Sequence, residues 1–432
     1  MPETETSRQR ERHTFRSLLR VSEVDTRLLG MLAALAIIWI VFNIWSGGSF
    51  LTPRNLWNLS VQTSAVAIMA TGMVLVIVTR NIDLSVGSMV AAIGMAMALL
   101  QAEILPDLLG FDHWATWIIA LLAGIALGAI LGGFQGVIIA YIGVPSFIVT
   151  LGGLLAWRGV AWAMASGQTI APMDSTFQLL GGGARGNIGG GWSWVVAVIA
   201  CVAIVALLSN GRRQRRKFAL KLRPVWAEIT IGFMSCGAVL GSVAYLNSYY
   251  LPEMLALRRA EAEGLVVPPE GLQIPFGLAN PVLITILVTL VMVFISTRLR
   301  FGRYVFAIGG NPEAAELGGI NTKWVLVKTF ALMGVLVAIG SAVQVARLNA
   351  AVSGLGQLTE LYVIAAAVIG GTSLGGGIGT VPGAILGALV MQSLQSGMVL
   401  VGVDAPVQDI AVGIVLVTAV ASDSLFRRRT AQ

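Results

Sequence analysis

Few side chains in this sequence could do chemistry, and the first group of them lies in the stretch AIGGNPEAAELGGI, residues 307–320. The stretch carries Glu313 and Glu316 and lies between two apolar runs long enough to cross a bilayer. Asn311 is a favourable helix N-cap, and Pro312 suits the first helical position because its missing N–H would have no partner there. The pattern predicts a helix of about six residues, roughly 9 Å long, which is too polar to enter the membrane. It is either an ordinary loop helix or a docking knob for a soluble partner.

A second group lies in TRNIDLSVGS, residues 79–88, between two further apolar runs. Asp83 or Ser85 could cap the following helix, with the Arg80 side chain reaching to lipid headgroups. Alternatively, these residues line a transport pathway, because ionisable groups near membrane depth are expensive and usually functional. The sequence leaves both interpretations open. The residues assigned to such a pathway are Asn81, Asp83, Ser85, Thr372 and Ser373.

Catalytic and cofactor motifs are missing from the sequence. A nucleotide-binding Walker A loop needs Gly-x4-Gly-Lys-Ser/Thr, and only Lys328 among the lysines precedes a serine or threonine, with Val327 before it. The two histidines, His13 and His113, are too few for an imidazole metal cluster. There is no nucleophile elbow and no carboxylate pair of catalytic spacing. We therefore expect no enzyme activity, no metal and no directly bound cofactor.

Hydropathy dictates the elements that position these residues. Hydrophobic residues make up 56% of the chain and charged residues 11%, whereas soluble domains carry about 25% charged residues. A helix needs about 20 apolar residues to cross the hydrocarbon core, and a backbone in lipid must satisfy its own hydrogen bonds. Long runs without charge occur at Leu28–Trp45, Trp114–Tyr141, Gly191–Ser209, Phe276–Thr297 and Leu361–Val403. The sequence predicts an all-α polytopic membrane protein.

Twelve crossings are expected from the apolar runs. They lie at 28–46, 55–79, 84–102, 114–133, 145–165, 191–209, 225–247, 276–297, 324–346, 359–374, 379–401 and 406–423. The GGTSLGGGIG run at 370–379 favours a break or a re-entrant turn over a continuous helix, so some crossings are expected to be half-helices. The expected count is therefore about ten to twelve.

The net charge of +7 does not indicate nucleic acid, because the basic residues gather at segment ends, where they set membrane orientation. When the crossings are counted, all the basic segments fall on one side and the acidic loops on the other, so both termini are expected in the cytoplasm. Arg212–Arg223 are expected to contact anionic lipid headgroups. The predicted parts are a cytoplasmic tail at 1–27, a transmembrane domain at 28–423 with an insert at 209–251 (a basic loop and an extra hydrophobic segment), and a cytoplasmic tail at 424–432.

Glycine spacing predicts how the helices pack. Small residues every four positions let helix backbones approach closely in lipid. The chain has two such series, Gly124, Gly128, Gly132 and Gly136, and then Gly375, Gly379, Gly383 and Gly387. A polar, glycine-bearing turn occurs in both 79–95 and 370–387, and this faint repeat indicates two weakly related halves. Cys201 and Cys236 are expected to pack as small hydrophobic residues.

Four longer stretches resemble one known family. They are NIDLSVGSM at 81–89, GVPSFIVTLGGLLAWRG at 143–159, FGRYVFAIGGNPEAAELGGIN at 301–321 and AAAVIGGTSLGGGIGTVPGAILGALV at 365–390. Together they resemble the permease subunits of bacterial sugar ABC importers of the ribose/xylose type, over most of the chain. The VPSFIVTL stretch and the insert at 209–251 make the xylose branch of that family the closer likeness.

The resemblance implies a multi-pass protein of the bacterial inner membrane that works as a homodimer. It implies two partners, a cytoplasmic ATPase that uses ATP and a periplasmic sugar-binding protein. The short helix would be the coupling helix that docks the ATPase, formed by Gly309, Gly310, Asn311, Pro312, Glu313, Ala314, Ala315, Glu316, Leu317 and Gly318. The implied cargo is a monosaccharide, most consistently xylose or a related pentose. Import of ribose, galactose or multiple sugars stays open within the family, and a self-sufficient ion-coupled secondary transporter is the alternative outside it.

Overall fold

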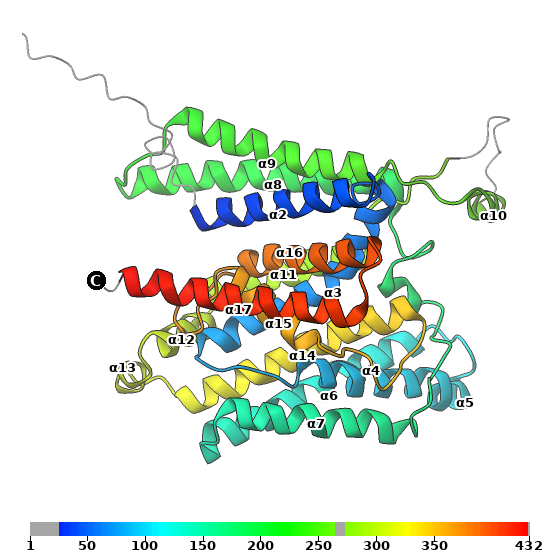
Figure 1. The fold of residues 1–432 in the computed structure, drawn as a ribbon, viewed down its shortest axis with the longest axis horizontal. Helices are drawn as coiled ribbons and strands as arrows, with labels where there is room; N and C mark the ends of the chain where they lie inside the picture. Colours follow the sequence, from blue (N-terminus) through cyan, green and yellow to red (C-terminus); the bar gives the residue numbers. More distant parts are fainter. Residues whose placement is uncertain (1–25, 264–272, 431–432) are drawn as a thin grey trace, which may run out of the picture.

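The computed structural model describes residues 26–263 and 273–430, which form helices joined by turns (Figure 1). Within these residues the β-type pairs are isolated bridges rather than strands. The predicted all-α polytopic class is confirmed. The tail expected at 1–27 lies almost wholly outside the described residues. Residues 424–430 continue the last helix.

Ten helices of the described chain are long and apolar enough to cross a membrane. They are α2 (Thr26–Trp45), α3 (Pro53–Val78), α4 (Val86–Leu99) with η1 (Leu100–Ile104) and α5 (Leu105–Leu109), α6 (Thr116–Val137) with η2 (Ile138–Ile142), α7 (Ser146–Met164), α8 (Gly189–Lys217), α9 (Val225–Leu246), α11 (Asn280–Arg298), α14 (Thr322–Leu348) and α16 (Val381–Leu400). The remaining elements are η3 (Phe177–Gly181), α10 (Glu253–Glu263), α12 (Arg300–Gly310), α13 (Pro312–Leu317), α15 (Thr359–Ile369) and α17 (Ala405–Thr430).

One of the twelve expected crossings, 359–374, is not a full-length helix. α15 has 11 residues, so it spans roughly 16 Å, about half of the ~30 Å hydrocarbon core. The glycine-rich turn 370–380 follows it, and several of its glycines have positive φ values that L-residues rarely adopt. The half-helix and break expected near residue 370 are therefore present. α17 has 26 residues, and its apolar part includes Ala405–Ala421.

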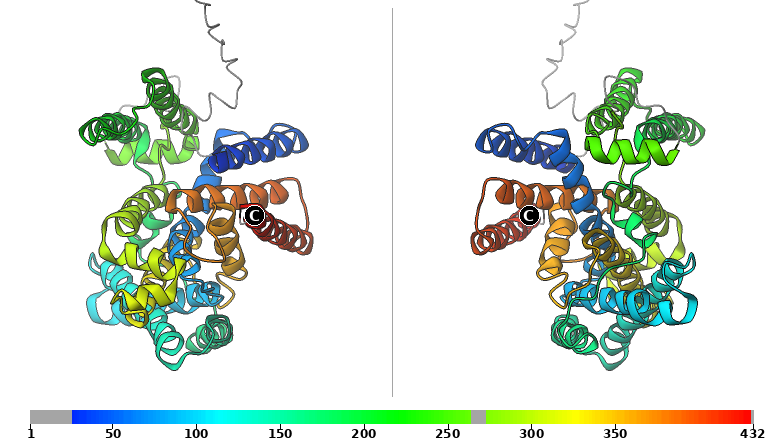
Figure 2. Two further views of the ribbon diagram at one scale, coloured as in Figure 1. Left: turned by 90° about the vertical axis from the view of Figure 1, so that its left-hand side faces the viewer. Right: turned by 90° about the vertical axis from the view of Figure 1, so that its right-hand side faces the viewer.

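The centre of the molecule is formed by α3 and α14, with the other helices packed around them (Figures 1 and 2). Every residue of α3 from Thr63 to Val78 is buried, because α14, α15, α16 and α11 cover it. By contrast, α2, α8 and α9 lie along one side with few buried residues (Figure 2). Such apolar helices with little protein cover have the composition of lipid-facing helices.

Two sets of helices pack alike but run in opposite directions. α3 packs on α15 and α16, whereas α14 packs on α4 and α6. α3 ends at Val78, beside Gly377 at the α13 end of the molecule, and this is the end at which α14 begins. The N-termini of α4 and α15 meet, because a Cβ at Gly87 would overlap the Glu360 carboxylate. This is the arrangement of an inverted repeat, in which α3, α4 and α6 correspond to α14, α15 and α16.

The two turns that looked alike in the sequence lie at the same end of the molecule. The backbone N–H of Gly377 in the turn 370–380 donates to the carbonyl oxygen of Val78, at the start of the turn 79–85, at 3.0 Å. In the inverted repeat, however, the counterpart of the turn 79–85 is 349–358, the segment that follows α14. The two similar turns are neighbours and not equivalent parts of the two halves.

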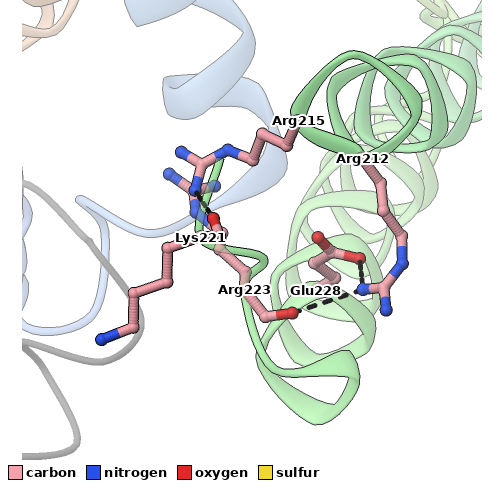
Figure 3. A network of polar contacts seen from close by, with 5 residues as sticks. All are labelled: Arg212, Arg215, Lys221, Arg223 and Glu228. Carbon is pink, nitrogen blue, oxygen red and sulfur yellow. Dashed lines mark hydrogen bonds and ion pairs between the residues drawn. The ribbon is translucent and has the colours of Figure 1, made fainter. Parts of the chain in front are cut away.

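The insert expected at 209–251 forms the end of α8, a basic turn and α9. Arg212 at the end of α8 pairs with Glu228 in the first turn of α9, with 2.6 Å between Nη1 and Oε2 (Figure 3). The same Nη1 donates to the carbonyl oxygen of Arg223 at 3.3 Å. These contacts close the turn, and α9 has the length and hydropathy of a membrane-crossing helix.

Glycines set the closest contact between two helices. A Cβ at Gly128 of α6 would overlap the carbonyl oxygen of Gly334 in α14, and one at Gly132 would overlap that of Phe330. Gly136 faces α14 in the same way, with Val327 Cα 2.9 Å from its added Cβ. Hydrogen at these positions allows the two backbones to touch.

The second glycine series does not lie on a single helix. Gly383 and Gly387 belong to α16 and lie against backbone carbonyls of Gly370 and Ala366. Residues 375 and 379 precede α16, in the turn 370–380, and Gly375 is exposed. Because α16 begins at Val381, the four-residue spacing does not put Gly375 and Gly379 on the same helix face as Gly383 and Gly387. Gly375 does not pack between helices.

Candidate functional site

α13 is a short helix closed at both ends by local hydrogen bonds. The Asn311 side chain accepts a hydrogen bond from the backbone N–H of Ala314 at 3.0 Å and caps the first turn. The last turn ends in a Schellman-type pair of backbone hydrogen bonds around Gly319, whose φ is +82°. Because both termini are satisfied, α13 is suited to move as one rigid unit.

The two faces of α13 differ in burial. Ala315 is 6% exposed and packs against the core, whereas Leu317 is 91% exposed. Glu313 and Glu316 are also exposed. The exposed surface of α13 therefore presents a large apolar side chain, Leu317, with two carboxylates near it.

Arg80 connects this region to the centre of the molecule. Its Nε donates to the carbonyl oxygen of Gly309 at 2.9 Å, and its Nη2 donates to that of Gly310 at 2.7 Å. These are the last carbonyls of α12, whose partial negative charge favours a guanidinium. Arg80 is thus bonded to α12 and not directed to lipid headgroups.

Backbone contacts complete the same connection. A Cβ at Gly309 would overlap the carbonyl oxygen of Val78, which also accepts the hydrogen bond from Gly377. The end of α3, the end of α12 and the turn 370–380 therefore meet directly before α13 begins. We call this contact the α13 joint and define it as Val78, Arg80, Gly309, Gly310 and Gly377.

Asp83 and Ser85 are buried at the start of α4. Asp83 Oδ1 accepts hydrogen bonds from the Ser85 backbone N–H at 2.9 Å and from Ser85 Oγ at 2.6 Å. Burial raises the pKa of the Asp83 carboxyl, and the two hydrogen bonds from Ser85 act in the opposite direction. Gln135 of α6 also bonds Ser85 Oγ, at 3.0 Å from its Nε2. These bonds form a local turn that leads the chain into α4.

The other residues assigned to a pathway are also in packed surroundings. Thr372 and Ser373 are buried, and their hydroxyl oxygens have no hydrogen-bond partner among the described residues. Asn81 Nδ2 donates to the carbonyl oxygen of Thr79 at 2.9 Å. The structure therefore places the five predicted residues at two packed turns, and none of the five lines the cavity described next.

A polar cavity of about 420 Å³ lies toward the end of the molecule opposite α13, between α3, α14, α15 and α16. Along α3 it extends from Asn55 to Val66, a rise of roughly 16 Å, or half the membrane core. The polar residues that line it are Asn55, Asn58, Gln62, Gln344, Arg347, Gln357, Thr359, Tyr362, Gln392, Gln395 and Ser396.

Sequence reasoning missed this cavity, although a signal for it exists. Asn55, Asn58 and Gln62 are spaced three and four residues apart and so share one face of α3, as Gln392 and Gln395 share one face of α16. Polar residues on one face of an apolar helix indicate a wet or protein-bonded face. The segments that bring these faces together are far apart in the sequence.

Two further charged residues lie where the halves meet. Arg158 of α7 donates through Nη1 to the carbonyl oxygens of Ser353 and Leu355, at 2.9 and 2.7 Å. This holds the connection between α14 and α15. Glu360 lies beside Gly87, and its Oε2 has no hydrogen-bond partner in the described chain. The sequence analysis did not single out either residue.

The fold and the comparison with family models define the class of protein. The model for the permease component of branched-chain amino acid transport systems matches residues 55–420, which include most of the long apolar helices. The chain therefore belongs to this family of membrane transport permeases.

Individual relatives are similar over nearly the whole chain. The xylose transport system permease protein XylH of Escherichia coli (strain K12) is 34% identical over 412 residues, 95% of each chain. XylH of Haemophilus influenzae is 35% identical and covers 95% of this chain and all of its own. The ribose import permease protein RbsC of Escherichia coli (strain K12) is 30% identical over 91% of this chain and 92% of its own. The resemblance seen in the sequence motifs is confirmed, and no solved structure gives a significant match.

Proposed function

We propose that the chain is the membrane-spanning permease subunit of an ABC importer that moves a monosaccharide, xylose or a related pentose, into the cytoplasm. The identity to XylH exceeds the identity to RbsC, 34% against 30%, and both relatives align over more than nine-tenths of the chain. Ribose and galactose are the next candidates, because relatives with those names also match over most of the chain.

The observation that carries the coupling proposal is α13 with its joint. α13 is capped at both ends, exposes Leu317, and is connected through Arg80 to α3. At its other end, Asn321 caps α14 by accepting a hydrogen bond from the backbone N–H of Trp324 at 2.9 Å. A force on α13 would thus reach both central helices through short connections.

This geometry suggests how ATP hydrolysis by a partner drives transport. The chain binds no nucleotide itself in this proposal, and a cytoplasmic ATPase seats on α13. Closure of an ATPase pair displaces α13 and, with it, the adjoining ends of α3 and α14. These helices also wall the cavity at the opposite end, so one displacement changes access to it. ATP and a periplasmic sugar-binding protein each favour one of two states by contacting it better.

The remaining partners follow from the exposed apolar helices. A second copy of the chain and lipid share the uncovered faces of α2, α8 and α9 and the rest of the apolar perimeter. The α8–α9 turn and the far end of α17 lie at the α13 end (Figure 1). The basic residues of these segments support a cytoplasmic location for that end, because basic residues gather on the cytoplasmic side of membrane proteins.

The test of coupling is Leu317→Glu. A carboxylate in place of the exposed leucine would not enter an apolar pocket of the ATPase, so ATP-dependent pentose uptake by the reconstituted complex should fall at least tenfold. Because Leu317 is 91% exposed, the folded permease itself should keep its thermal stability. Copurification with the ATPase measures docking directly.

The matched control is Leu108→Glu in α5, at the opposite end of the molecule, where Leu108 is 73% exposed. This variant should copurify with the ATPase as the wild type does. Normal copurification and uptake by Leu317→Glu would overturn the docking assignment.

The alternative, an ion-coupled transporter that works alone, predicts transport by the purified chain without an ATPase, whereas our proposal predicts none. The purified chain in vesicles without nucleotide or partner subunits should not concentrate a pentose. Accumulation under an ion gradient alone would support that alternative and remove the role proposed for α13.

A further inference from the structure

The polar cavity between α3, α14, α15 and α16 has a gradient of burial. Arg347 and Gln357 at its mouth are exposed, whereas Gln392 and Tyr362 in its depth are buried. Its volume of about 420 Å³ falls in the range of roughly 300–1,000 Å³ typical of small-molecule sites. The cavity is therefore open to solvent at one end and buried at the other, and we call it the chamber.

Several amides of the chamber are not used by the protein, although Asn55 Nδ2 donates to the carbonyl oxygen of Phe50 at 2.8 Å. Asn58, Gln62 and Gln344 make no side-chain hydrogen bond within the described part of the chain, and their polar atoms are not among those buried without a partner. They therefore face the chamber. Gln392 Nε2 donates to Gln395 Oε1 at 3.1 Å, which leaves the rest of both amide groups available.

The chemistry of this lining selects a class of ligand. Each amide offers two N–H donors and a carbonyl acceptor, which matches the hydroxyls of a sugar, because every hydroxyl both donates and accepts. The chamber has one charged residue, Arg347, at its mouth, and no carboxylate lines it. A zwitterionic amino acid would leave its ammonium group without a counter-charge there.

We infer that this chamber is where the transported molecule sits within the permease, and that its ligand is a neutral polyhydroxylated molecule the size of a monosaccharide held by the unpartnered amides. This inference rests on the proposed import function and deepens it. It also separates the sugar class from the branched-chain amino acid class named for the family model.

The test measures uptake of radiolabelled D-xylose by vesicles that contain the permease, its ATPase and its binding protein. Gln62→Leu and Gln392→Leu each remove one amide while keeping a similar volume. Each should lower uptake kcat/KM about fivefold, since a neutral hydrogen bond contributes modestly, and the double variant should lower it by more than tenfold. Excess unlabelled leucine should not compete in the wild type.

Two further variants keep the result interpretable. Gln168→Leu makes the same change on an exposed loop outside the chamber and should leave uptake unchanged. Gln344→Trp blocks the chamber by volume and should abolish uptake whether or not the amides bond the ligand. Copurification with the ATPase shows that each variant is folded and assembled.

Each outcome supports or overturns one statement. If the assembled wild type imports D-xylose but all three chamber variants import it with unchanged kcat/KM, the chamber assignment is wrong and the import function stands. If the assembled wild type imports radiolabelled leucine in the same ATP-dependent assay and does not import D-xylose, the sugar class is wrong. If the complete wild-type system imports nothing that depends on ATP, the proposed function fails, and this is visible without any variant.

Discussion

Asp83 and Arg80 lie three residues apart in one turn, but their side chains bond different parts of the molecule. Arg80 bonds a distant helix end, whereas Asp83 bonds Ser85, two residues away. Asp83 is 1% exposed and borders no part of the chamber. At this scale the hydrogen-bond partners, and not the charges, distinguish Arg80, for which we propose a coupling role, from Asp83, which stabilises its own turn.

The first prediction concerns Asp83. Asp83→Ala removes the acceptor of two hydrogen bonds and should lower the stability of the folded protein by about 1–3 kcal/mol, with little change in uptake per folded molecule. Asp83→Asn keeps an oxygen in place and should be milder. Thermal unfolding in detergent and vesicle uptake measure the two effects. Loss of uptake by Asp83→Asn at normal stability would restore the pathway role.

The second prediction concerns Arg80. Arg80→Gln removes the charged fork from the last two carbonyls of α12, so α13 should still dock the ATPase but transmit its movement poorly. Uptake should fall about tenfold while ATP hydrolysis continues, and Arg80→Lys should be intermediate because an ammonium keeps the charge without the fork. Arg54→Gln, at the start of α3, is the control. Equal losses of uptake and ATP hydrolysis in Arg80→Gln would indicate disrupted assembly and not disrupted coupling.

At the scale of elements, α6 and α14 pack more closely than helices with side chains between them can. Gly128 and Gly132 place backbone against backbone, and Gly334 contributes from the other helix. With Gly136, four glycines leave this interface without side chains between the two backbones. Only one face of α6 contacts α14, so a glycine on another face of α6 does not meet the α14 backbone.

The third prediction uses that difference. Gly128→Ala puts a methyl group onto the Gly334 carbonyl and should cost about 1–3 kcal/mol by forcing the helices apart. Gly133→Ala, five residues further along α6, meets only the Ala331 Cβ at 3.7 Å and should be neutral. Thermal unfolding in detergent compares the pair. Equal stability of the two variants would show that the interface can relax.

The whole molecule has two distinct ends joined by α3 and α14. One end carries α13, the α13 joint and the basic turn between α8 and α9. The other end opens into the chamber. An inverted repeat explains how both ends are built from related helices, since each half contributes one central helix and one shorter helix that begins inside the molecule.

The fourth prediction concerns orientation in the membrane. In a background with Cys201 and Cys236 replaced by alanine, Glu313→Cys should react with a membrane-impermeant maleimide only in inside-out vesicles. Gln168→Cys, beyond the far end of α7, should react only in right-side-out vesicles. The reversed pattern would place α13 outside and exclude a cytoplasmic ATPase.

Composition and local spacing were enough to predict the all-α polytopic class, the break near residue 370 and a short helix after Asn311. These depend on hydropathy, on glycine conformation and on capping, which act within a few residues along the chain. The crossing predicted at 359–374 is a half-length helix, because apolar composition does not reveal that α15 stops after 11 residues.

The α13 joint, the chamber and the equivalence of the two halves emerged only in the folded molecule. Arg80 and Gly309 are 229 residues apart, and the chamber combines faces of four helices. A polar side chain on an apolar helix has the same local pattern whether it bonds a distant carbonyl, fills a turn or faces a cavity. Its role is decided by which backbone approaches it, and in lipid that approach is governed by the close fit of small residues between helices distant in the chain.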